Sequence, residues 1–191
     1  MSRRASVVEE GWGWTEFLAY FRRELGPLSA YERGYVPWLR ASPDFATAVD
    51  RAVRSRMPDG TMHNHQTRVR LSALITFGQA IIETHPKVGT WPDFHTFFLH
   101  LDRIKPWGIG PLTVYDVAER IGRYLCLEPD RVYLHAGPTL GAKALGIDVR
   151  GKAWLRMDEL PAPMQVLAAD EAEDFLCVFN AYLSRFNPSK L

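Results

Sequence analysis

Two glycines, Gly108 and Gly110, constrain the fold of this chain more than any other feature, because they separate two amphipathic segments. Residues 97–104 before them and 114–125 after them repeat apolar side chains at the spacing of an α-helix. Glycine adds no side chain and adopts positive φ without steric cost, so the run Gly108-Ile109-Gly110 permits a tight turn. Ile109 would fill the space between the two helices. The sequence therefore predicts a helical hairpin over residues 97–125.

The rest of the chain also has helical periodicity, so we expect an all-α fold: a compact helical bundle around this central hairpin. Ser42 is expected to cap a helix that has Pro43 at its first position. His85-Pro86 is expected to end the helix over residues 67–84. Residues 147–163 are expected to be irregular or briefly extended. The first hairpin helix is expected to start at residue 92, and residues 28–39 are expected to form a short helix or a turn-rich segment. The other helices are expected at 14–25, 43–57, 67–84, 130–136, 139–145 and 165–186.

Length and composition favour one domain over residues 1–191, since 47% hydrophobic residues supply enough apolar material for a core. Within it we distinguish N-terminal helices (12–90), the hairpin with the short helices after it (91–146), and an irregular segment with a closing helix (147–191). No apolar run has the length of a membrane span, and residues 1–11 lack the apolar stretch of a signal peptide. The expected protein is a cytoplasmic monomer without membrane contact.

The cysteine content argues against a metal or iron–sulfur site. Cys126 and Cys177 form no C-x-x-C pair and lie within apolar patterns, so we expect two buried thiols and neither metal nor cofactor. His95 and His100 fall within an apolar helix and are expected to be structural. The tryptophans other than Trp107 are expected to serve packing: Trp12, Trp14, Trp38, Trp91 and Trp154.

The hairpin has the properties of a phosphate-binding element. The amide groups around the glycines and at the start of the second helix could point outward, and a helix N-terminus attracts anions. Net charge is only +1, so any nucleic-acid surface has to arise from local clustering of charge. We expect the DNA backbone to be bound by Lys105, Trp107, Gly108, Ile109, Gly110 and Thr113. The alternative is an ordinary packing corner between two helices.

This segment resembles the helix-hairpin-helix motif, whose core is apolar–Gly–apolar–Gly followed shortly by Thr or Ser, here Thr113. The resemblance covers about thirty residues and extends to the helix-hairpin-helix DNA glycosylases. In that superfamily a catalytic Asp lies about twenty residues after the second glycine, at the start of the next helix, and Asp130 is at that distance. Bifunctional members have Lys two residues after that glycine, where this chain has Leu112, and the four-cysteine cluster of some relatives is absent.

The resemblance therefore implies a small, divergent, monofunctional DNA glycosylase that removes a modified or damaged base and leaves an abasic site. Asp130 would stabilise positive charge at C1′ of the sugar and orient a water molecule. The base could be a lesion in DNA repair or a hypermodified phage base in antiviral defence, and the residues do not choose between them. Asp130 could equally be only a helix N-cap, because Pro129-Asp130 precedes an apolar segment. The competing functions are a non-catalytic DNA-binding module and an interaction protein.

A polar loop at residues 61–66 is the second candidate site. His63, Asn64, His65 and Gln66 lie together there, followed by Arg68. These groups could fill the gap left by an extruded base or read that base, and Tyr133 and His135 could line its pocket. The run HNHQT resembles a loop of adenine-type glycosylases, although only 42 residues separate Gln66 from Gly108, fewer than in those relatives. The alternative is a solvated loop that caps the following helix; without an evident third ligand, metal binding by the two histidines is disfavoured. Flanking positive charge comes from Arg51, Arg54, Arg56, Arg68 and Arg70.

Overall fold

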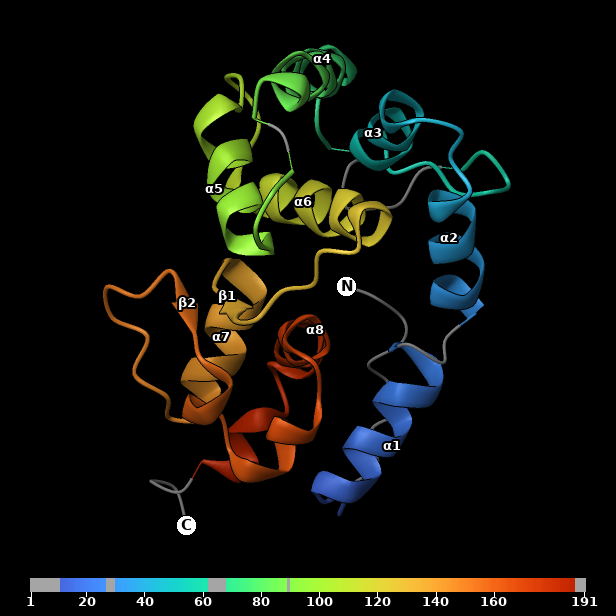
Figure 1. Ribbon diagram of the computed structural model, residues 1–191. Coiled ribbons are helices and arrows are strands. Elements are labelled where there is room, and N and C mark those ends of the chain that lie inside the picture. The colour runs from blue at the N-terminus through green and yellow to red at the C-terminus, as the bar shows by residue number, and fades with distance from the viewer. Residues whose placement is uncertain (1–10, 27–29, 62–67, 89, 188–191) are drawn as a thin grey trace. The chain divides into compact units, whose positions relative to one another are not determined.

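The computed structural model describes residues 11–26, 30–61, 68–88 and 90–187, with side chains for all of these except 30–32 and 86–88. The described residues form a mostly helical protein, as expected, with eight α-helices and one two-stranded ladder (Figure 1). The α-helices are α1 (Trp14–Glu24), α2 (Ala30–Arg40), α3 (Phe45–Val53), α4 (Leu71–Val88), α5 (Phe94–Ile104), α6 (Pro111–Leu125), α7 (Ala136–Ala144) and α8 (Ala169–Phe179). The short elements are β1 (Val132–Tyr133), β2 (Trp154–Leu155), η2 (Met157–Glu159), η3 (Ala162–Val166) and η4 (Leu183–Phe186).

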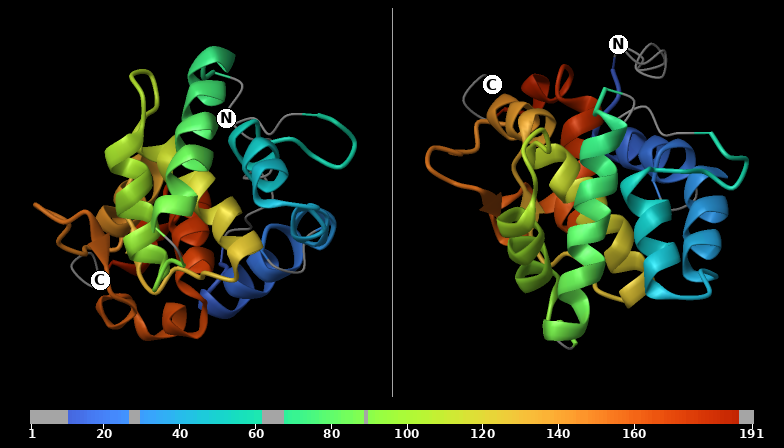
Figure 2. Two further views of the ribbon diagram at one scale, coloured as in Figure 1. Left: turned by 45° about the horizontal axis from the view of Figure 1, so that its top comes forward. Right: turned by 90° about the horizontal axis from the view of Figure 1, so that it is seen from above.

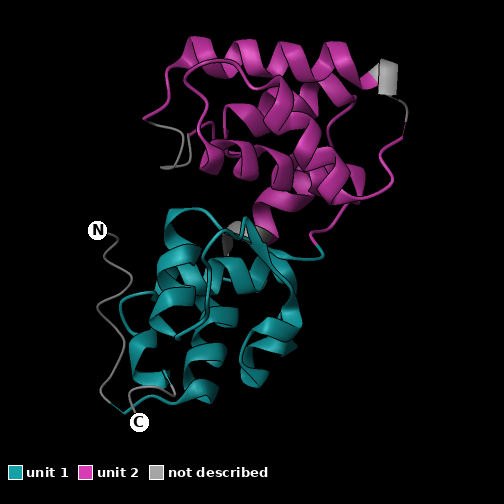
Figure 3. Cartoon of the chain, turned by 90° about the vertical axis from the view of Figure 1, so that its left-hand side faces the viewer, with its two compact units in different colours: residues 1–32, 130–191 teal, residues 33–129 magenta. Residues whose placement is uncertain are grey.

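The chain divides into two compact units (Figure 3). Unit 1 comprises residues 1–32 and 130–191, and unit 2 comprises residues 33–129. These boundaries do not coincide with the expected segment boundaries after residues 90 and 146. The N-terminal and C-terminal parts of the chain therefore share one unit, and the hairpin helices belong to the other.

An aromatic cluster forms the core of unit 1. Phe17 and Phe21 of α1 are fully buried together with Phe175 and Phe179 of α8, and the Phe17 and Phe179 rings meet edge to face at 5.0 Å. Trp14 stacks on Phe186, with ring centroids 4.3 Å apart. Aromatic side chains bury large apolar areas, so this cluster holds α1 against the C-terminal elements although about 150 residues separate them in sequence.

Glycines allow α7 and α8 to pack closely. A Cβ atom at Gly137 would lie 2.3 Å from Cys177 Sγ, and one at Gly141 would lie 2.3 Å from the backbone oxygen of Leu176. Two glycines at this four-residue spacing fall on one face of α7. Only residues without a side chain fit this face against α8.

Unit 2 is a bundle in which α4 lies between α3 and α5, and α6 packs on α3 and α5 (Figure 2). Its core is made of fully or nearly fully buried residues from these four helices, among them Val49, Phe77, Phe97 and Ile121. Gly78 brings α4 close to α3, since a Cβ there would lie 3.2 Å from Val53. Trp38 of α2 lies under the guanidinium group of Arg51, 4.2 Å from its ring centroid.

Two expected helix ends are wrong. Asp44, rather than Ser42, caps α3, because its carboxylate accepts the Thr47 N–H at 2.7 Å, whereas the Ser42 hydroxyl donates to the Leu39 carbonyl. The helix α4 continues through His85-Pro86 to Val88. His85 stacks on Phe45 at 3.8 Å, and this contact with α3 favours the continued helix over the local signal of proline.

The expected helix at 130–136 is also wrong. Val132 and Tyr133 form β1, which pairs antiparallel with β2 in the register Val132–Leu155 and Tyr133–Trp154. Val132 and Leu155 are fully buried in the unit 1 core, so long-range pairing determines the conformation here. The expected closing helix at 165–186 is divided into η3, α8 and η4. The expectation of two buried cysteines is wrong: Cys126, which ends α6 in the left-handed conformation with φ of 57°, is exposed, and Cys177 is partly exposed.

Candidate nucleic-acid interface

The turn between α5 and α6 exposes one large aromatic side chain and buries the apolar one next to it. The Ile109 N–H donates to the Pro106 carbonyl at 3.2 Å, which closes a four-residue turn, and Gly108 at its third position has φ of +92°. Positive φ at that position is the requirement of a type II turn and favours glycine. Ile109 is buried as expected, whereas the Trp107 side chain is 89% exposed.

The start of α6 is open to solvent. Gly110 is its N-cap, in extended conformation and without a capping side chain, and no acidic residue occupies the first turn. A Cβ atom at Gly110 would have no neighbour within 4 Å. Pro111 has no N–H, so the donors without an acceptor inside the helix are the backbone N–H groups of Leu112 and Thr113. These two groups, together with the helix dipole, form the anion-binding feature of the hairpin.

Two expected contact residues have other roles in the structure. The Thr113 side chain is buried, so only its backbone N–H is a candidate contact. Lys105 forms an ion pair with Asp102 across one helical turn. Because both side chains of this pair are partly exposed, the contribution of the pair to stability is small and the ammonium group remains within reach of solvent.

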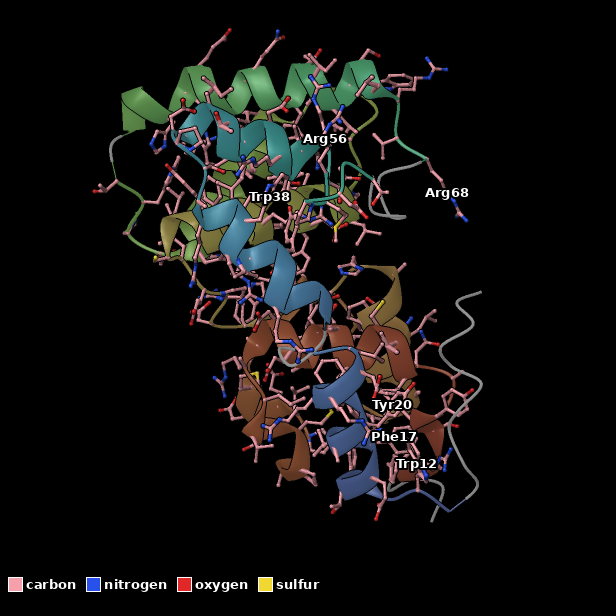
Figure 4. All side chains as sticks on the ribbon, turned by 90° about the vertical axis from the view of Figure 1, so that its right-hand side faces the viewer. Trp12, Phe17, Tyr20, Trp38, Arg56 and Arg68 are labelled. Carbon is pink, nitrogen blue, oxygen red and sulfur yellow. The ribbon has the colours of Figure 1, made fainter. Side chains whose placement is uncertain are left out.

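The first turn of α4 lies against the hairpin, a proximity that the sequence did not indicate. A Cβ at Gly108 would contact the Ala73 Cβ at 3.7 Å, and Ala73 donates its N–H to the Arg70 carbonyl at the start of α4. Arg68 and Arg70 are both exposed, and the Arg68 side chain extends away from the ribbon (Figure 4). This first turn has no acidic residue. Two helix starts and two arginines therefore belong to one region of unit 2.

The polar-loop residues His63, Asn64, His65 and Gln66 lie outside the described residues, and this region directly precedes Arg68. Among the flanking arginines, Arg51 donates to the Trp38 carbonyl at 2.7 Å and Arg54 pairs with Asp50 at 2.5 Å. Both groups are held within unit 2. The charge of Arg54 is balanced by Asp50, whereas Arg51 keeps its charge but has its guanidinium group held against Trp38.

Asp130 lies in unit 1, two residues before the start of β1, and not at the start of a helix. Its side chain is 62% exposed, and both carboxylate oxygens accept hydrogen bonds of 2.7 Å from Arg131. The Arg131 guanidinium also lies 4.7 Å from the centre of the Trp154 ring. The carboxylate is therefore accessible to a ligand, but its charge is already balanced by a positioned arginine.

Tyr133 and His135, expected to line a base pocket, are buried beside α8. His135 Nε2 lies 2.6 Å from Glu173 Oε1, and both side chains are almost fully covered. Neither side chain presents a free ring face. Glu173 was not among the expected site residues, and its one local signal in the sequence is an acidic residue on the apolar face of α8.

The described residues contain no group of three or more His, Cys, Asp or Glu side chains arranged to hold a metal ion. In the same part of the chain, none of the helices combines the length and the apolar character that crossing a membrane requires. His100 is structural as expected: its Nε2 lies 2.8 Å from the Thr84 hydroxyl, and its ring packs on Trp91.

Comparisons with family models, with curated proteins and with solved structures found no match to this chain.

Proposed function

We propose that this chain binds the sugar–phosphate backbone of double-stranded DNA through the hairpin between α5 and α6. The observation that carries the proposal is the open start of α6, where Gly110 leaves the Leu112 and Thr113 N–H groups without a capping side chain. A phosphate oxygen is the ligand that such a helix start favours. The exposed Arg68 and Arg70 beside the hairpin add the positive charge that attracts a polyanion. Contacts of this kind position a protein on DNA without reading sequence.

Two isosteric substitutions test this proposal. Asp and Asn are both strong N-cap residues, so Gly110→Asp and Gly110→Asn should each preserve α6. Only Asp places a negative charge where the phosphate is expected. We expect both variants to bind a fluorescein-labelled duplex more weakly than the wild type, because each side chain accepts the N–H groups that a phosphate would. Gly110→Asp should bind at least about tenfold more weakly than Gly110→Asn, as measured by fluorescence anisotropy at fixed salt.

The thermal unfolding midpoints of both variants, followed by circular dichroism, should stay close to that of the wild type. Wild-type affinity for DNA in both variants, or a wild-type protein that binds no duplex at low salt, would contradict the proposal. A wild-type protein that binds no duplex would leave the packing-corner alternative.

A second candidate function is base excision, as the resemblance to monofunctional helix-hairpin-helix glycosylases implies. Two observations favour it: Asp130 stands twenty positions after Gly110, and its carboxylate is exposed. In this function Asp130 would stabilise the oxocarbenium-like sugar as the base departs, and water would complete the hydrolysis to an abasic site. The Arg131 ion pair opposes it, because a carboxylate with two hydrogen bonds to arginine has less charge to offer a cation.

The test of base excision is strand breakage after alkali treatment. DNA with several modified bases, including phage DNA with hypermodified bases, is incubated with the protein and then heated in alkali, which breaks the strand at abasic sites. Asp130→Asn should abolish breakage while leaving duplex binding unchanged. Breakage that persists in Asp130→Asn, or no breakage on any DNA, would reject Asp130 as a catalytic residue and leave DNA binding as the function.

A further inference from the structure

We infer that Trp107 is a stacking platform for an unpaired nucleobase, so that the hairpin prefers DNA in which a nucleotide beside the duplex is unpaired. The inference rests on the proposed DNA binding and specifies the form of DNA that this site takes. It concerns an aromatic face, whereas the proposed function concerns backbone amide groups.

Exposure of Trp107 is the first observation. At 89% it is the most exposed of the large apolar side chains in the described part of the chain. Burying an indole ring stabilises a protein or a complex, and a tryptophan left in water at a turn leaves that free energy available for a ligand. Packing within unit 2 does not require this side chain, since Ile109 fills the space between the helices.

The backbone around Trp107 is held in one conformation. Trp107 is the second residue of the turn that the Ile109-to-Pro106 hydrogen bond closes, and the positive φ of Gly108 fixes the next residue. The turn also lies next to α4, because a Cβ added at Gly108 would be 3.7 Å from the Ala73 Cβ. A ring on a fixed turn loses less conformational entropy on binding than one on a mobile loop.

The surroundings of Trp107 select a nucleic acid over other apolar partners. Arg68 and Arg70 are exposed beside the hairpin, and the first turns of α4 and α6 contain no acidic residue. Leu71, at the start of α4, is also 49% exposed. An aromatic ring among cations and free backbone N–H groups matches a base attached to its phosphates, because every base has a π-face whatever its sequence.

The experiment compares three DNA ligands that differ only at one position. The first is a fully paired duplex, the second carries one extra unpaired nucleotide as a bulge, and the third carries an abasic tetrahydrofuran residue in that bulge. The second and third share the same backbone, so their affinity ratio reports the base alone. We expect the full-length protein to bind the base-bearing bulge about tenfold more tightly than the abasic bulge.

Trp107→Ala should reduce this ratio to about one. Trp107→Phe should keep part of the ratio, because the smaller ring still stacks. Leu99→Ala is the matched control, since Leu99 is a 51% exposed apolar residue earlier on α5, and it should leave the ratio at the wild-type value. The ratio should also be the same at 50 and 200 mM salt, because stacking releases no counterions.

The possible failures are distinguishable. Binding of the paired duplex with a base-to-abasic ratio of one would overturn the role of Trp107 and leave the proposed function intact. Equal loss of affinity for all three DNAs in Trp107→Ala would also overturn it, since the ring would then act on the paired duplex. No binding to any of the three DNAs would reject the proposed function itself. Trp107-dependent binding to anionic phospholipid vesicles, with no base preference, would assign the ring to a lipid surface instead.

Discussion

At the scale of single residues, the turn that presents Trp107 depends on the positive φ of Gly108. Any other L-residue there is strained, and the space around the position is not the reason, because an added Cβ would meet Ala73 at an ordinary contact distance of 3.7 Å. We expect Gly108→Ala to lower the free energy of unfolding by about 1–2 kcal/mol, measured by urea denaturation.

Gly34→Ala is the matched control for this prediction. Gly34 lies inside α2 with no atom within 4 Å of an added Cβ and without positive φ. The same chemical change should therefore stabilise the protein by about 0.5–1 kcal/mol, because alanine is the better helix former. Two changes of the same sign would mean that the strain at Gly108 does not govern its substitution.

His100 makes the stability of unit 2 depend on pH. Burial, together with the nearby charge of Arg103, lowers the pKa of His100 below its ordinary value of 6.5. As pH falls through 6.5, the unfolded chain therefore takes up a proton before the folded chain does, and stability is lost. Burial lowers the pKa of His85 as well, so this residue acts in the same direction.

His100→Gln should consequently show a smaller loss of unfolding free energy between pH 7.5 and pH 5.5 than the wild type. Glutamine keeps a polar group near the Thr84 hydroxyl but does not titrate. Urea denaturation of both proteins at the two pH values measures the difference. An identical pH dependence in the two proteins would show that His100 does not titrate differently in the folded and unfolded chains.

At the scale of elements, the hairpin helices were predictable and the elements around Asp130 were not. Residues 94–125 carry their own signals: Asp93 caps α5 through the Thr96 N–H, Pro111 begins α6, and the apolar period runs through both helices. The strand β1 has no such local signal, because its partner β2 is about twenty residues away. The same limitation hid the proximity of Gly108 to Ala73, where a Cβ added at Gly108 would come within 3.7 Å, although the two residues are 35 positions apart in sequence.

The candidate site was predictable to a similar degree. The pattern Gly-Ile-Gly indicated the turn, the buried Ile109 and the open start of α6, since all three follow from residue type and order. The burial of His135 beside Glu173 depends on α7 packing on α8, and no pattern within either helix indicates this pair.

The packing of α7 on α8 can be tested at its closest point. Gly141→Ala would place a Cβ 2.3 Å from the Leu176 carbonyl oxygen, so the helices must separate. We expect a loss of about 1–3 kcal/mol in unfolding free energy, measured by urea denaturation. Leu140→Ala, at an exposed position of the same helix, is the control and should change stability by about 0.5 kcal/mol or less. Equal effects of the two substitutions would show that α7 tolerates a side chain on this face.

At the scale of the whole molecule, the proposed DNA binding has to come from local charge, because the formal net charge is only +1. Counterion release predicts that each cation that neutralises a phosphate contributes about 0.9 to the slope of log affinity against log salt. Replacing both Arg68 and Arg70 by Ala should therefore flatten the slope by about 1.8, measured by fluorescence anisotropy on the paired duplex between 50 and 200 mM salt.

A second double variant separates local charge from total charge. Arg150 and Arg156 lie in unit 1, and each is exposed and paired with an aspartate, Asp148 or Asp158. Replacing both by Ala takes the net charge from +1 to −1, the same change as in the first double variant. Local binding predicts an unchanged salt slope for this second protein. Equal flattening in the two double variants would mean that the overall field of the protein attracts DNA, and that the arginines beside the hairpin have no special part in binding.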